Sequence, residues 1–168
     1  MSSAGKSRRE LIHALNLAMR DASGSGVLYS EAVAERLGIA SSDLECLDYV
    51  VRGPKTAGEL ARATGLTTGA ITGVIDRLEK AGFVRRAHDP GDRRRVIVTT
   101  LPAVGERIVP LFKPMERAQM AAVKLLSDQQ LAFLLDFYKE AHRAALLALE
   151  ELKTMPRDKQ RPRKTGRR

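Results

Sequence analysis

The feature that most constrains the fold is a change in the spacing of apolar residues at Gly82. Before this glycine the helical spacing of apolar residues predicts two short amphipathic helices. The first opens at Thr56, which is placed to form a capping box with Glu59, and it stops at Gly65. The second follows almost directly, and its apolar residues are Ile71, Val74, Ile75 and Leu78. Two helices so closely joined indicate a helix-turn-helix.

After Gly82 the apolar residues alternate, which predicts a β-hairpin. Its strands are residues 83–89 (FVRRAHD) and 94–100 (RRVIVTT), joined by a turn within DPGDRRR at 89–95. Helix, turn, helix and hairpin in this order indicate a winged helix-turn-helix, whose second helix enters the major groove of DNA. A hairpin tip this rich in arginine suits the minor groove of A·T-rich DNA, which is narrow and strongly negative.

The segments on either side of this lobe are predicted to be helical. On the N-terminal side we expect a helix at 7–22, a break at the ASGSG run 22–26, a second helix closed by Gly38, and a third capped by Ser41 or Ser42. On the C-terminal side we expect a long helix after residue 100 that is kinked or interrupted by its two internal prolines. A last helix opens with a capping box at Ser127 and runs to about residue 152.

Charge is concentrated in two places. The chain of 168 residues has a formal net charge of +9. Five arginines and two aspartates lie at 85–95, eight basic residues and one acid lie at 153–168, and the remainder is close to neutral. Both basic segments are candidates for contact with nucleic acid, although a basic tail with prolines is also typical of a disordered, solubilising terminus.

Composition argues against several other classes of protein. No apolar run is long enough to span a membrane, and because the N-terminus is polar we expect no secretory signal. Cys46 is the only cysteine, which excludes an internal disulfide and fits a reducing cytoplasm. We find no catalytic or metal-binding motif, and we expect no cofactor. Acids on either side of Cys46 would raise its pKa, which argues against a redox sensor.

The segment TAGELARATGLTTGAITGVIDRLEKAGFVRRAHDPGDRRRVIV at 56–98 resembles the DNA-binding lobe of the MarR family of bacterial transcription regulators. Helix order extends the resemblance more loosely over 10–150. It implies a single domain over 1–168 with a mainly α fold and a small β-hairpin wing, in which a winged helix-turn-helix at 53–100 is flanked by helical dimerisation and ligand regions at 7–52 and 101–152. The segment 153–168 would be a basic tail. The resemblance further implies a cytoplasmic homodimer that binds a pseudo-palindromic operator in double-stranded DNA as a repressor, until a small-molecule effector releases it.

The resemblance also assigns the DNA-binding residues. The start of the recognition helix would face the major groove with Thr67, Thr68, Gly69, Ala70, Thr72 and Gly73. Arg94 would enter the minor groove, and Asp92, two residues away on the same side of the outgoing strand, would orient its guanidinium. Phosphate contacts are predicted for Arg86, Arg93 and Arg95, and effector contacts for Tyr29, Tyr49 and Phe112. Arg77 is also interpreted as a phosphate contact, because it lies one helical turn beyond Gly73 and has no acid at a facing position on its own helix, although a solvated arginine is the alternative.

One residue departs from the family pattern. Many relatives have arginine where this chain has Gly73, so bidentate recognition of guanine from that position is lost. The threonines can still contact thymine methyl groups. Two other interpretations stay open at this point: an architectural protein that binds DNA with little sequence preference through wing and tail, and an enzyme or adaptor built on a degenerate winged helix. An intact wing argues against the second.

Overall fold

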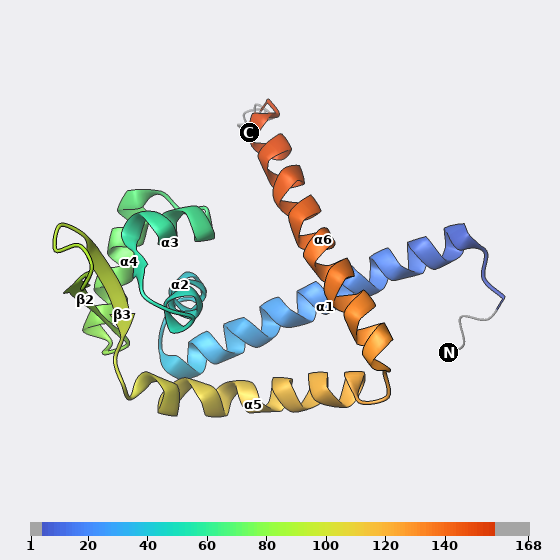
Figure 1. Cartoon of the computed structure of the whole chain (residues 1–168), viewed down its shortest axis with the longest axis horizontal. Coiled ribbons are helices and arrows are strands. Elements are labelled where there is room, and N and C mark those ends of the chain that lie inside the picture. The colour runs from blue at the N-terminus through green and yellow to red at the C-terminus, as the bar shows by residue number, and fades with distance from the viewer. Residues whose placement is uncertain (1–4, 157–168) are drawn as a thin grey trace, which may run out of the picture. The chain divides into compact units, whose positions relative to one another are not determined.

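The computed structural model describes residues 5–156 and divides the chain into two compact units, the first ending at Pro114 and the second beginning at Met115. The first unit contains a long N-terminal helix, three shorter helices and a small sheet (Figure 1). The helix α5 (Val104–Val123) continues from the first unit into the second. The basic tail predicted at 153–168 falls, from residue 157 onward, outside the described residues.

The N-terminal segment is one continuous helix, α1 (Arg8–Leu37), so the predicted break at 22–26 was wrong. A glycine inside a helix costs only about 1 kcal/mol relative to alanine. Two glycines are therefore not enough to break a helix of 30 residues. The serines of this run also bond to the helix itself. Ser23 donates its hydroxyl to the carbonyl of Met19 at 2.9 Å, and Ser25 donates to that of Asp21 at 3.0 Å.

The next helix, α2 (Ser41–Val51), follows a tight turn at Gly38, whose left-handed backbone (φ 69°) closes α1 as predicted. The predicted serine cap was wrong, because Ala40 occupies the capping position and no side chain caps this end. Ser41 and Ser42 lie instead in the first turn, together with the buried Asp43.

The helix-turn-helix consists of α3 (Ala57–Thr64) and α4 (Thr68–Lys80). The predicted capping box of Thr56 and Glu59 opens α3, and Gly65 closes it with φ 71°. Thr67 caps α4. α4 ends at Lys80 with Ala81 as its C-cap, and the chain then reverses at Gly82, whose φ of 73° glycine adopts without strain, before the hairpin begins.

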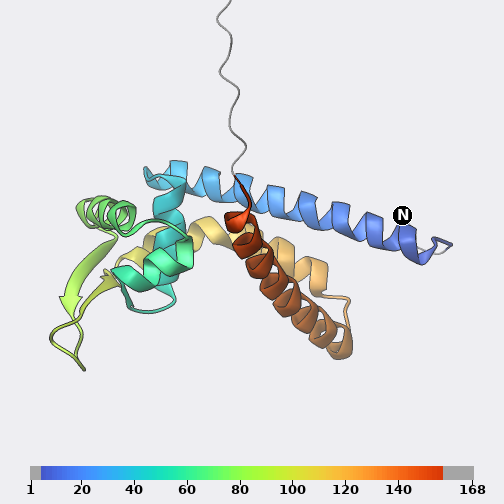
Figure 2. The same ribbon diagram turned by 90° about the horizontal axis from the view of Figure 1, so that it is seen from above.

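The wing contains β2 (Val84–His88) and β3 (Val96–Thr100), which pair antiparallel from Val84↔Thr100 to His88↔Val96. A two-residue strand that sequence did not predict, β1 (Lys55–Thr56), pairs with the other edge of β3. The sheet order is therefore β1-β3-β2. Since β1 directly precedes α3, this extra strand ties the helix-turn-helix to the base of the wing. Figure 2 shows the hairpin extending away from the helices of the lobe.

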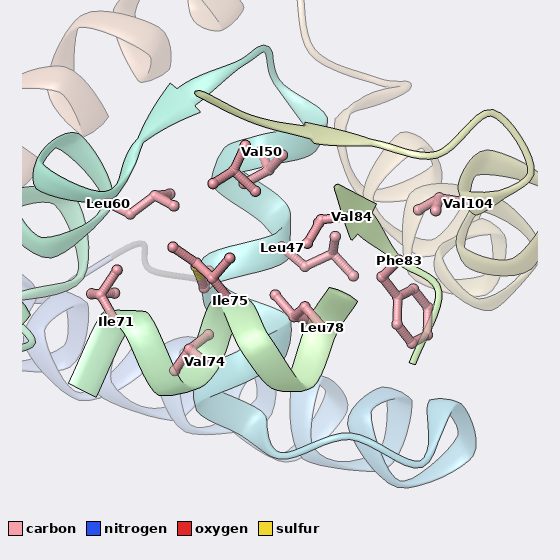
Figure 3. Packing of buried hydrophobic residues seen from close by; sticks show 12 residues of the cluster. Leu47, Val50, Leu60, Ile71, Val74, Ile75, Leu78, Phe83, Val84 and Val104 are labelled. Carbon is pink, nitrogen blue, oxygen red and sulfur yellow. The ribbon is translucent and has the colours of Figure 1, made fainter. Parts of the chain in front are cut away.

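A single apolar cluster holds these elements together (Figure 3). Its fully buried side chains come from α2, α3, α4, the hairpin and the start of α5, and include Leu47, Leu60, Ile71, Ile75, Leu78, Phe83 and Val104. The predicted apolar face of α4, Ile71, Val74, Ile75 and Leu78, is confirmed, with each residue at most 2 % exposed. A second, smaller cluster joins α1 to α2 through Val33, Ala34 and Leu44.

The two prolines do not interrupt α5. An internal proline removes one backbone donor and its ring crowds the carbonyl four residues earlier, but its fixed φ is itself helical, and Pro110 and Pro114 both lie inside this 20-residue helix. In the second unit, α6 (Asp128–Thr154) opens with the predicted capping box of Ser127 and Gln130. This helix has no buried residue, and its exposed large apolar side chains include Leu131, Phe133, Leu135, Tyr138, Leu146 and Leu149.

Candidate nucleic-acid interface

The first turn of α4 is exposed at most of its positions. Thr67, Thr68, Gly69, Ala70 and Thr72 are exposed, and Gly73 is half-buried. One face of α4 is anchored in the core while its N-terminal turn projects outward, so the structure brings together the six residues that sequence assigned to base recognition. Their contact with DNA stays a prediction.

The hydroxyls of this surface are partly used within the helix. Thr67 Oγ1 accepts from the backbone N–H of Ala70 at 3.3 Å, and Thr72 donates its hydroxyl to the carbonyl of Thr68 at 3.0 Å. Thr72 therefore keeps its lone pairs and its methyl group for a partner. Without a long side chain at Gly73, this surface offers apolar contacts and single hydrogen bonds, which suit thymine methyl groups better than guanine.

The wing turn is held by two carboxylates that bond to its backbone. Asp89 Oδ1 accepts from the N–H of Gly91 at 2.8 Å, and Asp92 Oδ1 accepts from the N–H of Arg94 at 3.0 Å. Asp92 and Arg94 lie in a turn closed by the bond from Arg95 N–H to the Asp92 carbonyl, and not on the outgoing strand as predicted. Asp92 thus fixes the backbone of Arg94, whereas sequence suggested a contact with its guanidinium.

The arginines of the wing differ in how far they are already paired. Arg93 and Arg94 are exposed and form no ion pair among residues 5–156. Arg95 lies 3.6 Å from Glu59 and 3.8 Å from Asp89, which is long for a strong pair. The tip therefore presents two free guanidinium groups and one loosely held one, on a turn whose backbone is fixed.

Arg86 has a different environment from the tip arginines. It bonds to Asp76 and Glu79 of α4, each at 2.5 Å, and its own backbone N–H donates to Glu79 at 3.0 Å. The hydrogen bond that the guanidinium donates to Asp76, with support from the one to Glu79, raises the pKa of Arg86. These bonds tie β2 to α4. The phosphate contact of Arg86 stays a prediction, and a phosphate would have to compete with these two carboxylates for the guanidinium.

Arg77 is also paired, with a residue that sequence reasoning missed. Its Nε lies 2.9 Å from Asp43 Oδ2 and its Nη2 lies 2.6 Å from Asp43 Oδ1. The acids nearest in sequence, Asp76 and Glu79, lie one and two residues away on the same helix and do not face Arg77. Asp43 lies on α2, 34 residues away, and no local pattern marks it as a partner.

The three residues proposed for an effector do not form one group. Tyr29 and Phe112 pack together with ring centroids 6.2 Å apart, and Tyr29 donates its hydroxyl to the Leu111 carbonyl at 2.7 Å. Tyr49 packs against the larger apolar cluster, the one that contains Leu47 and Leu60, and its hydroxyl donates to the Ala63 carbonyl at 3.3 Å. It is therefore separated from Tyr29 and Phe112 in the packing.

A cavity of about 790 Å³ lies between α1, α2 and the start of α5. Phe112, Val27 and Leu44 supply apolar surface, and its polar residues are Ser23, Ser30, Glu31, Ser41, Ser42, Glu45, Asp48 and Arg52. Tyr29 lines a smaller cavity of about 270 Å³ with Pro110 and Pro114. Of the three predicted effector residues, Phe112 alone borders the larger space.

Cys46 is fully buried in the core of the lobe. Burial raises its pKa to about 11, and Asp43 and Glu45 contribute further. Sequence identified flanking acids as a cause, but burial is the larger one. Between residues 5 and 156 the structure holds no group of three or more metal-ligating side chains. None of the described helices is long and apolar enough to cross a membrane.

The sequence of this chain is similar to those of known proteins. A model described as the MarR family matches residues 44–96, from α2 to the start of β3. The uncharacterized HTH-type transcriptional regulator YcgE of Bacillus subtilis is 41% identical over 128 residues, which cover 76% of this chain and 83% of YcgE.

Solved structures show the same fold at lower sequence identity. A MarR family transcriptional regulator from Silicibacter pomeroyi DSS superposes with a TM-score of 0.65 at 15% identity, over 86% of this chain and 98% of that one. NadR, solved in complex with 4-hydroxyphenylacetate, superposes with a TM-score of 0.59 at 19% identity, over 84% of this chain and 96% of NadR.

Proposed function

Because this chain belongs to the MarR family of DNA-binding, winged helix-turn-helix transcriptional regulators, we propose that it is a homodimeric repressor of specific operators. In this proposal each subunit places α4 in a major groove and its wing tip in the adjacent minor groove. The observation that carries it is the wing turn, where Arg93 and Arg94 are exposed on a backbone fixed by two aspartates. A rigid basic tip loses less conformational entropy on binding than a flexible one.

The helices outside the lobe supply the dimer contacts in this proposal. Apolar side chains that are 41–51% exposed lie along the first part of α1, including Leu11, Ile12, Leu15 and Leu17, and others lie along α6. Exposed apolar surface on this scale is typical of an interface. The two regions at 7–52 and 101–152 would then serve dimerisation, and 53–100 would serve DNA binding.

Release by a small molecule is the second part of the proposal. The cavity between α1, α2 and α5 is the candidate effector site, with Phe112 at its wall. A protein of the same fold, NadR, has been solved in complex with 4-hydroxyphenylacetate, which supports small-molecule binding by this fold. The basic segment 153–168 would add affinity for any DNA sequence without adding specificity, since its proline-punctuated pattern has no apolar period.

Selection from a random duplex library, followed by footprinting, tests sequence-specific binding. We expect a protected site with two half-sites related by a two-fold axis. Uniform coating of DNA that disappears with added salt would support the architectural alternative instead.

Arg94→Ala then tests the role of the wing. It should cost about 1–3 kcal/mol of affinity for the selected duplex, the range for one good arginine contact. A reporter gene placed behind the selected site should be transcribed less when the protein is present, and an increase would contradict repression.

A further inference from the structure

Arg77 and Asp43 form a two-pronged ion pair between the recognition helix and α2. Two parallel hydrogen bonds join them, at 2.6 and 2.9 Å. The Asp43 side chain is 2% exposed, whereas that of Arg77 is 56% exposed. A bidentate guanidinium–carboxylate contact fixes direction as well as distance, because both groups are planar.

Asp43 depends on this partner. A buried carboxylate is costly unless it is paired and hydrogen-bonded. Among the described residues, Arg77 is the only cation that forms an ion pair with Asp43, and the remaining contact from Ser42 Oγ is long at 3.4 Å. A shift or rotation of α4 would break the two hydrogen bonds and leave the Asp43 carboxylate unpaired, so the ion pair resists such a movement.

The position of Arg77 on α4 matters for DNA recognition. Arg77 lies one helical turn after Gly73, so it belongs to the same helix as the base-facing residues but follows them. Asp76 and Glu79 of the same helix bond to Arg86 on β2. Ion pairs therefore hold α4 both to α2 and to the wing, beyond what the apolar core provides.

We propose that Asp43 and Arg77 are positioning residues, which fix the rotation of the recognition helix so that its N-terminal turn meets the correct base edges. This proposal rests on the proposed sequence-specific DNA binding. Arg77 acts through Asp43, and phosphate contact is not its main role. Ser42 and Leu44, on either side of Asp43, line the cavity of about 790 Å³, so the pair also connects the wall of that cavity to α4.

Arg77→Lys separates positioning from simple charge. Lysine keeps the positive charge that a phosphate contact needs but lacks the planar guanidinium that forms two parallel hydrogen bonds to a carboxylate. Fluorescence anisotropy would compare the full-length variant with wild type, on the duplex selected by wild type and on a scrambled duplex of the same composition, over a series of salt concentrations. We expect about a tenfold loss of preference for the selected duplex, corresponding to one charge-assisted hydrogen bond. Affinity for the scrambled duplex and the slope of affinity against salt should not change.

Asp43→Asn provides a second test, in which simple electrostatics and the positioning role predict opposite changes in affinity. Removing a negative charge near DNA would tighten binding to both duplexes if only Coulomb forces mattered. Positioning predicts weaker binding to the selected duplex alone. Thermal unfolding of each variant checks that it is folded at the assay temperature. If Asp43→Asn does not fold, the comparison is made with the double variant Asp43→Leu/Arg77→Met, which leaves no unpaired charge and should still lack the preference.

Several results would overturn the proposal. Wild-type preference in Arg77→Lys would show that charge suffices, and wild-type preference in a folded Asp43→Asn or in the double variant would show that the pair only stabilises the fold. Equal losses on both duplexes with a salt slope reduced by about one in Arg77→Gln would identify a phosphate contact. Failure of the wild-type protein to prefer any selected duplex would instead refute the proposed function, so the two failures are distinguishable.

Discussion

The carboxylate of Asp92 accepts a hydrogen bond from the backbone N–H of Arg94, with oxygen and nitrogen 3.0 Å apart. An aspartate that bonds to the backbone two residues ahead mimics a backbone turn and stabilises it. Asp92 therefore acts on the course of the chain at the wing tip, and the guanidinium of Arg94 is left free for a partner. This separates two roles of Asp92 that sequence could not distinguish, its negative charge and its acceptor oxygen.

Asp92→Ala should weaken binding to the selected operator by about 0.5–1.5 kcal/mol, because the turn loses a hydrogen bond and Arg94 loses its fixed position. Asp92→Asn is the matched control, since an amide oxygen accepts the same bond without the charge. It should bind as tightly as wild type or more tightly. Parallel titrations at one salt concentration measure both. Tighter binding by Asp92→Ala would show that the charge of Asp92 matters and its turn does not.

Cys46 should be unreactive in the folded protein, because burial raises its pKa from 9.0 to about 11. A thiol-specific reagent at pH 8 should label it only when denaturant unfolds the chain. Labelling at the same rate in native buffer would contradict the burial.

The same pKa shift predicts how stability depends on pH. Above pH 9 the unfolded thiol loses its proton while the folded one retains it, so the stabilisation is complete below pH 9 and is lost as pH rises toward 11. The free energy of unfolding of wild type minus that of Cys46→Ala should therefore fall across this range. A constant difference would show that the thiol titrates alike in both states.

Local signals explain why the DNA-binding lobe could be predicted. The capping box of Thr56 with Glu59 and the glycine at 82 act within one turn of the chain, and sequence shows such features directly. The contacts that sequence missed join distant residues. Lys55 pairs with Val98 in the sheet, and Arg77 pairs with Asp43 on another helix.

Local breaking signals also failed to predict where a helix ends. Serines and glycines at 22–26 are typical of a loop, yet the hydroxyls of Ser23 and Ser25 bond back to α1 and the helix continues. Pro110 and Pro114 are likewise accommodated in α5. For the site, five of the six residues predicted to face the major groove are exposed, and Gly73 is half-buried. Sequence could not tell a free arginine such as Arg94 from a paired one such as Arg77. Pairing depends on which carboxylate the fold brings near.

Leu135→Glu should convert a dimer into a monomer. Leu131, Leu135 and Tyr138 recur along one side of α6, and Leu135 and Tyr138 are more than half exposed in the single chain. Burying a carboxylate in an apolar interface without a partner is costly. Sedimentation at micromolar concentration should show two subunits for wild type and one for Leu135→Glu. Gln129→Glu, with the same charge change at an exposed polar position of α6, should stay dimeric. A monomeric wild type would refute dimerisation.

Gly73→Arg should give the recognition helix a preference for guanine. A Cβ at this position would meet, within 4 Å, only the guanidinium of Arg77, at an ordinary contact distance of 3.5 Å, so a side chain fits. Arginine here could make the bidentate contact to guanine that the wild-type surface lacks, worth about 1–3 kcal/mol of discrimination. Repulsion from Arg77, four residues along, should cost only a few tenths of a kcal/mol.

Gly73→Ala is the control for this change. Alanine should stabilise α4 against thermal unfolding by about 1 kcal/mol through helix propensity and leave the selected sequence as it is. Selection from random duplexes with wild type and both variants should therefore yield one shared consensus for wild type and Gly73→Ala. Gly73→Arg should select an additional guanine in each half-site. The same consensus from all three proteins would mean that position 73 does not face a base edge, and the placement of α4 in the major groove would need to be revised.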